Sequence, residues 1–491
     1  MEEKPLVKQL SQQVVKGSIW VFSLRFAQQL FDFLRIIILA RFLAPADFGL
    51  MGIAMVTMAT LETFSYMGLQ QALIQRENIS NPYLDTAWTL SLFRGILVFG
   101  MLYAFAPHAS LFFKTPEAVL IIRVTGIAIL LQAFTNIGIV TFQKELAFDR
   151  QFIYQCTGVV ASFAVSLVTV YFLRNVWAIV FGFLSGHLTR LVVSYAIHPY
   201  RPRISFNYEK AGELLTFGKW LMGSSIVIFL FSQGDDIFVG RVLGVTMLGF
   251  YQLAYRISNT PTSEIASIIS QVTFPAYSKM QNRSTSLQTG YVKVYRTTLL
   301  LAIPVTGGIY VLAPEFTEIF LTDKWMPIVP IIRVLVIFGL FRAIGSTSSI
   351  LFHGIGRPKV ATQWETVRLF ILIVFIYPFT IRFGIIGTAC AVLVSQIIIT
   401  AGLTWAVSVI TVYPMMDQVR HALLPTLCTA AMMTIVFFLK SVPPHVSMAH
   451  FVAFVMAGIV AYGASLIILD RCFNCGIQSL MLESVASLRK K

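Results

Sequence analysis

The sequence predicts an all-α polytopic membrane protein, and three observations support this class. Hydrophobic residues make up 57% of the 491 residues and charged residues only 12%, whereas soluble domains carry roughly 25% charged residues. Apolar runs of about 20 residues, the length that a helix needs to cross a bilayer, recur along the whole chain. The polar stretches between the runs are short, so we expect no extramembrane domain large enough to fold alone.

We expect about 14 transmembrane helices, because the chain holds that many apolar runs of sufficient length. In chain order, the runs cover residues 17–40, 48–73, 85–106, 118–140, 152–173, 176–197, 216–240, 248–275, 296–313, 328–350, 362–381, 385–410, 421–440 and 449–469.

The distribution of lysine and arginine predicts that both termini are cytoplasmic. Alternate loops carry about twice as many Lys and Arg residues as the opposite loops, and basic loops stay on the cytoplasmic side of membrane proteins. Both chain ends are also basic, and an even number of spans places them on the same side. The net charge of +15 therefore reflects membrane orientation and does not indicate a nucleic-acid partner.

An internal repeat with an offset of 200 residues divides the predicted helices into two halves. Residues 40–49 (ARFLAPADFG) align with residues 240–249 (GRVLGVTMLG), and Trp20 and Trp220 share the offset. Six helices per half is an even number, so both halves have the same orientation and form a parallel pseudo-repeat with a central site. The predicted organisation is a cytoplasmic N-terminal segment (1–16), an N-terminal six-helix bundle (17–200), a cytoplasmic linker (201–215), a C-terminal six-helix bundle (216–410), two extra transmembrane helices (411–470) and a cytoplasmic tail (471–491).

The first apolar run carries a polar stripe in its middle, made of Arg25, Gln28, Gln29, Asp32 and Arg35. At about 100° per residue, these side chains fall within roughly a third of the helix circumference. A charge at bilayer depth costs several kcal/mol, so it survives mainly where it faces a bundle interior or a wet cavity. The stripe therefore indicates a helix that lines a path for a charged molecule.

A second polar stripe lies on the eighth run, where Gln252, Arg256 and Asn259 stack at helical spacing and Tyr255 flanks them. Further charged residues fall inside other runs: Arg94, Arg342, Glu62, Asp235, Asp236 and Glu264. Arginine suits phosphate because its planar fork is always charged and can bond in a bidentate manner. One interpretation is a hydrated cationic cavity that accepts phosphate or another anion on Arg25, Arg35, Arg94, Arg256 and Arg342.

The alternative interpretation is that these charges pair with one another and only lock helices together. Arg25 would then pair with Asp32, and Arg256 with Asp235 or Glu264. The same carboxylates, together with Glu62 and Asp236, are candidates for coupling groups, since burial raises a carboxyl pKa. No metal site, cofactor or ATP site is predicted, so the coupling ion would be H⁺ or Na⁺, or the substrate gradient would drive transport.

Five segments of the sequence carry a family resemblance: ARFLAPADFGLMGIA, MGLQQALIQRENIS and TFQKELAFDR in the first half, and GRVLGVTMLGFYQLAYRISNTP and SQVTFPAYSKMQ in the second. They resemble the polysaccharide-transporter branch of the MOP (multidrug/oligosaccharidyl-lipid/polysaccharide) superfamily. The resemblance covers essentially the whole chain and is closest to the colanic-acid-exporter type. It implies a MATE-like fold of two six-helix bundles with a central cavity. It also implies a flippase that moves undecaprenyl-diphosphate-linked oligosaccharide to the outer leaflet of the bacterial inner membrane.

In related flippases, cationic residues on the first and eighth helices line the cavity, and Arg25 and Arg256 occupy comparable places here. The implied mechanism is alternating access, with the diphosphate held on these two arginines. The sugars of the substrate would be contacted by polar side chains of the two stripes: Gln28, Gln29, Gln252, Tyr255 and Asn259. A monomer suffices, and the pathway's polymerase and glycosyltransferases are the implied partners, beside membrane lipids.

Two other functions remain open. A cation- or proton-coupled multidrug antiporter of the same superfamily needs an acidic cavity, for which Asp32, Asp235 and Asp236 are candidates. The excess of intramembrane arginine argues against it. A membrane enzyme acting on the same lipid-linked sugar needs a sizeable extramembrane loop with catalytic groups, and the loops here are too short. The sequence therefore predicts a transporter and not an enzyme.

Overall fold

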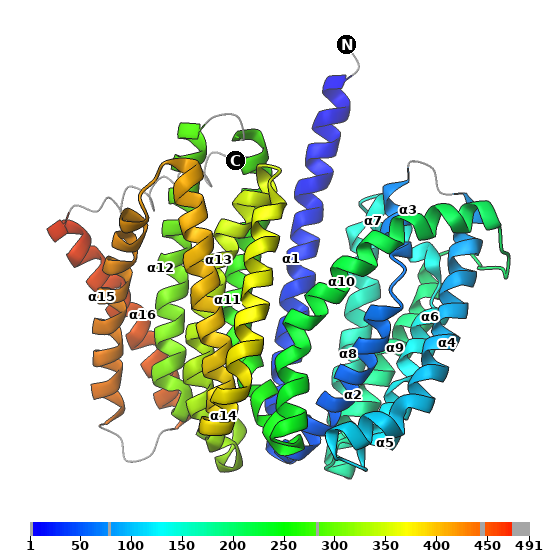
Figure 1. Cartoon of the computed structure of the whole chain (residues 1–491), viewed down its shortest axis with the longest axis horizontal. Helices are drawn as coiled ribbons and strands as arrows, with labels where there is room; N and C mark the ends of the chain where they lie inside the picture. Colours follow the sequence, from blue (N-terminus) through cyan, green and yellow to red (C-terminus); the bar gives the residue numbers. More distant parts are fainter. Residues whose placement is uncertain (1–2, 77–79, 281–283, 442–446, 474–491) are drawn as a thin grey trace. The chain divides into compact units, whose positions relative to one another are not determined.

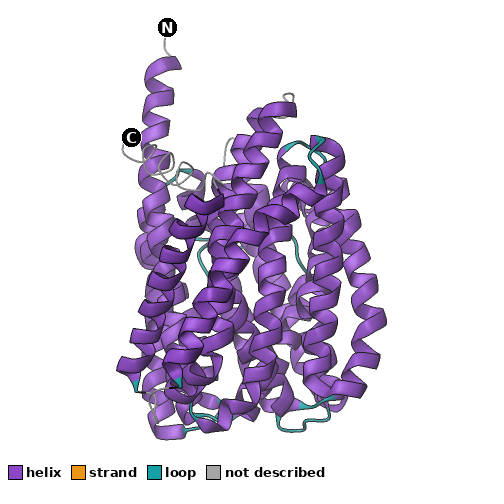
Figure 2. Cartoon of the chain, turned by 90° about the vertical axis from the view of Figure 1, so that its left-hand side faces the viewer, coloured by secondary structure: helices purple, strands orange, loops and turns teal. Residues whose placement is uncertain are grey.

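The computed structural model describes residues 3–76, 80–280, 284–441 and 447–473. Helices make up nearly all of this part of the chain, joined by short loops, and it contains no strand (Figure 2). Most of the predicted cytoplasmic tail, residues 474–491, lies outside the described residues. The all-α class predicted from the sequence is therefore confirmed.

The chain forms two compact units, residues 1–252 and 253–491. The first unit consists of α1 to α10, the short 3₁₀ helix η1 and the start of α11 (Figure 1). Their bounds are α1 Glu3–Phe42, α2 Pro45–Phe64, α3 Leu69–Gln75, α4 Asn81–Phe113, α5 Ala118–Thr125, α6 Ile127–Phe134, η1 Ile137–Ile139, α7 Val140–Lys144, α8 Phe148–Leu173, α9 Trp177–Ile197, α10 Tyr208–Val242 and α11 Val245–Met280.

The second unit consists of the rest of α11 and the helices that follow it. Their bounds are α12 Ser284–Phe316, the π-helix η2 Thr317–Leu321, the 3₁₀ helix η3 Asp323–Ile328, α13 Val329–Gly354, α14 Pro358–Thr411, α15 Met415–Lys440 and α16 Met448–Phe473. A break inside α14 at Gly384 (φ 59°, ψ −142°) separates the predicted runs 362–381 and 385–410. Glycine adopts this conformation at low cost.

Eight of the described helices are long and apolar enough to cross a membrane, or ten if two bent helix pairs each count as one span. The chain is therefore a multi-span helical membrane protein. Helices α1, α10 and α11 cover predicted runs but are not among these candidate spans. The count of 14 spans stays a prediction.

The predicted run 48–73 is not one straight helix. It divides into α2 and α3, which are bent by 50° at a break of four residues. Gly68 at the break has a left-handed conformation (φ 59°), and this ends the α2 path and starts α3 in a new direction. The break leaves backbone carbonyls at the end of α2 without helical partners.

Two glycines related by the repeat let α2 approach the start of α11 very closely. A Cβ on Gly49 would lie 1.8 Å from the carbonyl oxygen of Val245, and a Cβ on Gly249 would lie 1.9 Å from that of Pro45. The contact is reciprocal. The 200-residue offset relates Gly49 to Gly249 and Pro45 to Val245, so each glycine approaches the counterpart of the other glycine's partner. Backbones this close leave no room for any side chain at either position, so both residues have to be glycine.

The chain between α9 and α10 is extended and is fastened to α4. The backbone N–H of Arg203 donates to Asp85 Oδ1 at 3.0 Å, and that of Ser205 donates to Thr89 Oγ1 at 3.1 Å. Asn207 accepts from the Lys210 N–H at 3.1 Å and caps α10. The segment predicted as a linker is therefore tied to the first unit along its length.

His198 closes the start of this segment in a neutral form. Its Nδ1 accepts from the backbone N–H of Tyr200 at 3.2 Å, and its Nε2 lies 3.1 Å from Thr141 Oγ1. The Thr141 hydroxyl donates to the Gly138 carbonyl, so Nε2 carries the proton and donates to Thr141. Burial lowers the pKa of His198 below the usual 6.5; Arg150 and Arg201 lower it further, and Glu145 opposes them.

We predict that Gly49→Ala and Gly249→Ala each lower the thermal unfolding midpoint of the purified protein, because the added methyl has to push two backbones apart. Overpacking of this kind costs about 1–3 kcal/mol. Gly100→Ala is the matched control, since Gly100 lies in α4 with no atom within 4 Å of its Cβ position. Equal midpoints for all three variants would contradict the close crossing.

We also predict that protonation of His198 destabilises the protein. Because its folded pKa lies below its unfolded value, the stabilisation is complete above pH 6.5 and is lost as pH falls from 6.5 toward the folded value. Between about pH 7.5 and about pH 5.5, the unfolding midpoint of the wild type should fall further than that of His198→Gln. Parallel pH profiles for the two proteins would refute this role.

Candidate functional site

The first unit contains a cavity of about 440 Å³ beside the break between α2 and α3. Its wall is built from α2 and its C-terminal end, α4, α6 and α10. A smaller cavity of about 150 Å³ shares Tyr66, Arg94 and Gln132 with it. The polar and aromatic side chains that line the larger cavity are Glu62, Thr63, Tyr66, Arg94, Gln132, Ser225, Phe229, Ser232 and Gln233.

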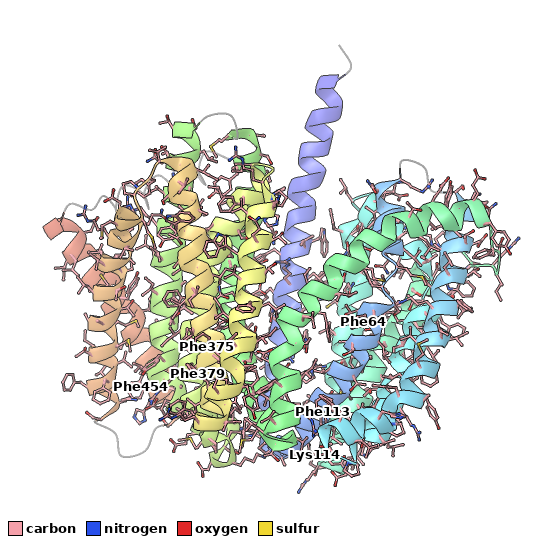
Figure 3. All side chains as sticks on the ribbon, viewed as in Figure 1. Phe64, Phe113, Lys114, Phe375, Phe379 and Phe454 are labelled. Atoms are coloured by element: carbon pink, nitrogen blue, oxygen red, sulfur yellow. The ribbon has the colours of Figure 1, made fainter. Side chains whose placement is uncertain are left out.

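Arg94 of α4 reaches the broken end of α2. Its Nε donates to the Ser65 carbonyl at 2.8 Å and to Ser65 Oγ at 3.2 Å, and its Nη2 donates to the Glu62 carbonyl at 3.3 Å. Phe64, labelled in Figure 3, is the last residue of α2. A cation is favourable at a helix C-terminus, so Arg94 stabilises the break. The Arg94 side chain also lines the larger cavity. The predicted anion ligand is thus also a helix cap.

The polar stripe of α1 is divided between packing and exposure. Arg35 Nη2 lies 2.7 Å from Asp32 Oδ1, and Arg35 Nη1 donates to Ser162 Oγ of α8 at 2.6 Å. These two stripe residues therefore fasten α1 to α8, as the helix-locking interpretation expects, although the partner of Asp32 in this pair is Arg35. Arg25 and Gln29 are exposed, and the half-buried Gln28 lies near them.

The adjacent carboxylates of α10 face two different residues of α11. Tyr251 donates its hydroxyl proton to Asp235 Oδ2 at 2.7 Å, and Gln252 Nε2 lies 3.3 Å from Asp236 Oδ2. Gly52 of α2 makes room for this amide, since a Cβ there would lie 2.3 Å from Gln252 Oε1. Gln252, predicted to contact sugar, thus bonds to a predicted coupling carboxylate.

In the second unit, the structure brings Tyr255 and Arg342 together. Arg342 Nη1 donates to the Tyr255 hydroxyl at 3.1 Å. Asn259 donates to the Tyr255 carbonyl at 3.1 Å, and its buried Oδ1 accepts no hydrogen bond among the described residues. Arg256 is exposed and Glu264 is half-buried. A polar surface with one phenol and one guanidinium can bond both sugar hydroxyls and anions.

A charged pair in α14 was not predicted from the sequence. Arg368 lies 3.3 Å from Glu365 Oε2 and donates to Gln396 Oε1 at 3.2 Å. Gln396 is buried, and its Nε2 lies 3.3 Å from Thr400 Oγ1. The available signal was a Glu and an Arg three residues apart inside the run 362–381. Arg190 of α9 was also not predicted as a site residue, although it is a charged residue inside the run 176–197.

Two arginines at corresponding places in the two halves adopt the same local arrangement. Arg123 lies over the ring of Tyr103 at 4.2 Å and donates to the Tyr103 carbonyl. Arg333 lies over the ring of Tyr310 at 5.3 Å and donates to the Tyr310 carbonyl. Each guanidinium is thus held by the preceding long helix, and neither lines the larger cavity. Within the described residues, no group of three or more His, Cys, Asp or Glu side chains could hold a metal ion.

Comparison with known proteins identifies what this chain is similar to. A family model described as "Polysaccharide biosynthesis protein" matches residues 38–330. The lipopolysaccharide biosynthesis protein WzxC of Escherichia coli (strain K12) is 26% identical over 365 residues, which cover 74% of each chain.

Two solved structures share the fold. The lipid II flippase MurJ in an inward closed conformation superimposes with a TM-score of 0.74 over 93% of this chain and 99% of that one, at 18% identity. An inward-facing multidrug resistance MATE family transporter of the MOP superfamily gives a TM-score of 0.62 over 78% of this chain and 95% of that one, at 19% identity. The MATE-like fold implied by the sequence is therefore confirmed.

We predict that Arg94→Met destabilises the protein by about 2 kcal/mol, because the carbonyls at the end of α2 lose a charged donor. The readout is the thermal unfolding midpoint of purified protein. Arg123→Met serves as the control, since the one carbonyl that Arg123 reaches lies near an exposed part of α4. An unchanged midpoint for Arg94→Met would show that the break does not depend on this cap.

Proposed function

Because the chain belongs to the polysaccharide biosynthesis protein family, we propose that it is a flippase for an undecaprenyl-diphosphate-linked oligosaccharide. The family is one of transporters and not of enzymes, and the resemblance expected from the sequence is confirmed. The observation that carries the finer proposal is the set of arginines inside apolar helices, which suits an anionic substrate. The polyprenyl tail can stay in lipid while the diphosphate and the sugars pass through a polar path.

The substrate-binding residues are proposed from residue chemistry. Arg25 and Arg256, both exposed on helices that the resemblance places at the transport path, are the proposed diphosphate ligands, with Arg342 near Tyr255 as a third. Arg94 contributes positive charge to the larger cavity of the first unit. Arg35 holds the α1 stripe in place through Asp32 and Ser162. Sugar contacts are assigned to the half-buried or exposed Gln28, Gln29 and Tyr255, and to the buried Asn259.

The proposed mechanism is alternating access through a cationic cavity. The inward-open protein captures the diphosphate, and the head group is released at the outer leaflet. Asp235, Asp236 and Glu62 are the proposed coupling carboxylates, because each lies in an apolar helix and can hold a proton. The driving ion is proposed to be H⁺ or Na⁺.

The proposed setting is the bacterial inner membrane, with 14 spans arranged as two six-helix bundles plus two C-terminal helices. Both termini are cytoplasmic in this topology, and the basic loops support that orientation. A single chain suffices for transport. The polymerase and glycosyltransferases of the same pathway are its proposed partners.

A multidrug antiporter is the second candidate. The MATE-family fold neighbour and the adjacent carboxylates of α10 support it, because cationic drugs require acidic groups. Asp235 and Asp236 accept hydrogen bonds from Tyr251 and Gln252. The two carboxylates therefore join α10 to α11. The family match and the arginines favour the lipid-linked substrate.

We predict that this chain restores surface polymer in a bacterium deleted for its own polysaccharide flippase. Arg25→Ala and Arg256→Ala, compared at matched membrane levels, should each lower the polymer by about tenfold, since each removes a charge-assisted bond to the diphosphate. Arg382→Ala is the control, because Arg382 is exposed and lies against the ring of Phe383.

Full export by both variants would contradict the cationic-cavity mechanism. Drug resistance conferred by the chain in a susceptible host, without any restored polymer in several hosts, would favour the antiporter instead.

A further inference from the structure

Arg190 differs from the other arginines in the helix interiors of the described chain. Arg35, Arg94, Arg342 and Arg368 each donate hydrogen bonds to a side chain or a carbonyl. Arg190 makes no hydrogen bond, ion pair or ring contact with any described residue, and its Nε is buried without a hydrogen-bond partner. It lies in the interior of α9, a helix apolar enough to span the membrane. A guanidinium without such partners in the interior of a membrane helix is a candidate ligand for an anion.

The side chain of Arg190 points toward α8 and not toward lipid. Gly182, Gly186 and Arg190 follow one another at a spacing of four, and Gly182 and Gly186 pack against Ser166 and Ser162 of α8. The lipid face of α9 is formed by other residues, all strongly exposed and apolar: Phe181, Leu188 and Val192. Arg190 therefore continues the packing face of the helix, which α8 lies beside (Figure 1).

A glycine on α8 makes room for the guanidinium. A Cβ on Gly158 would lie 2.5 Å from Arg190 Nε and 2.7 Å from its Cγ. Tyr154 and Gln151 lie one and two turns, respectively, before Gly158 on the same face of α8. The Oε1 of Gln151 is also buried without a partner among the described residues. The contact between α8 and α9 thus holds two buried polar atoms, Arg190 Nε and Gln151 Oε1, without partners among the described residues.

The part of the α8–α9 contact around Arg190 carries net positive charge. Arg35 reaches Ser162, one turn along α8 from Gly158, but Asp32 neutralises it at 2.7 Å. No carboxylate forms an ion pair with Arg190 among the described residues. His187, one turn earlier on α9, and Tyr154 are the titratable groups that interact electrostatically with Arg190, and neither supplies an anion at neutral pH.

We propose that Arg190, seated on Gly158, binds the phosphate group of a lipid between α8 and α9. Arg190 lies seven residues before the end of α9, about 10 Å along the helix axis. In the proposed topology that end is cytoplasmic, the side from which a flippase takes its substrate. A lipid phosphate in that leaflet is within reach, and a guanidinium bonds it in a bidentate manner.

This inference rests on the proposed function for the location of the site, and two lipids could supply the phosphate. One is the diphosphate of the transported lipid, and the other is an anionic phospholipid of the inner leaflet. The assay is native mass spectrometry of the purified full-length chain titrated with undecaprenyl diphosphate, with dioleoyl phosphatidylglycerol and with undecaprenol, which has the same tail as the first and no phosphate.

Arg190→Gln should weaken binding of one or both phosphate lipids by about tenfold and leave undecaprenol binding unchanged. Arg190→Lys, which keeps the charge but loses the fork, should weaken it less. Gly158→Ala, which displaces the Arg190 side chain, should weaken it as well. The controls are Arg123→Ala and Gly100→Ala, and unfolding midpoints show that every variant is folded.

The lipid that is affected identifies the source of the phosphate. Weakened undecaprenyl diphosphate binding assigns Arg190 to the substrate path. If the wild type binds no undecaprenyl diphosphate, but phosphatidylglycerol binding depends on Arg190, the proposed function fails and the phosphate site stands. Unchanged affinity of Arg190→Gln for both phosphate lipids, or an equal loss for undecaprenol, would overturn the proposal.

Discussion

An arginine inside an apolar helix has to be solvated by other groups of the protein, and much of this structure follows from that requirement. Arg35 obtains a carboxylate from its own helix and a hydroxyl from α8, which fixes α1 on α8. Arg94 obtains carbonyls that only a broken helix can offer. Arg342 obtains a tyrosine hydroxyl from α11. Each charge thus determines a helix contact, and Arg190, whose buried Nε has no partner among the described residues, is the proposed phosphate ligand.

The repeat in the sequence acquires a physical meaning in the first unit. The offset of 200 residues relates Pro45 to Val245 and Gly49 to Gly249, and the structure joins these four residues in a reciprocal contact. The glycines are therefore required by the packing of related helices, and not only by local backbone conformation.

The sequence predicted the helices well and the side-chain contacts poorly. Apolar runs located the long helices, since transfer of apolar surface depends on composition alone, but they did not separate the bent pairs. The bend at Gly68 was missed because the residues around it suit a helix, and the cap that stabilises the bend comes from Arg94, far along the chain. Spacing on α1 grouped Asp32 with Arg35 but could not reveal Ser162. Arg190 was not predicted as a site residue because a sequence cannot show whether an arginine has partners. The structure shows that its Nε is buried and has no hydrogen-bond partner among the described residues.

Together, the family, the fold and the unpaired guanidinium support transport of a lipid that carries phosphate. The most direct test is a translocation assay in proteoliposomes that contain only this chain. A fluorescent oligosaccharide on undecaprenyl diphosphate should become accessible on the opposite leaflet, whereas the same oligosaccharide on a tail without phosphate should not. Equal translocation of both lipids, or of neither across several sugar structures, would contradict a flippase that recognises the diphosphate through arginine.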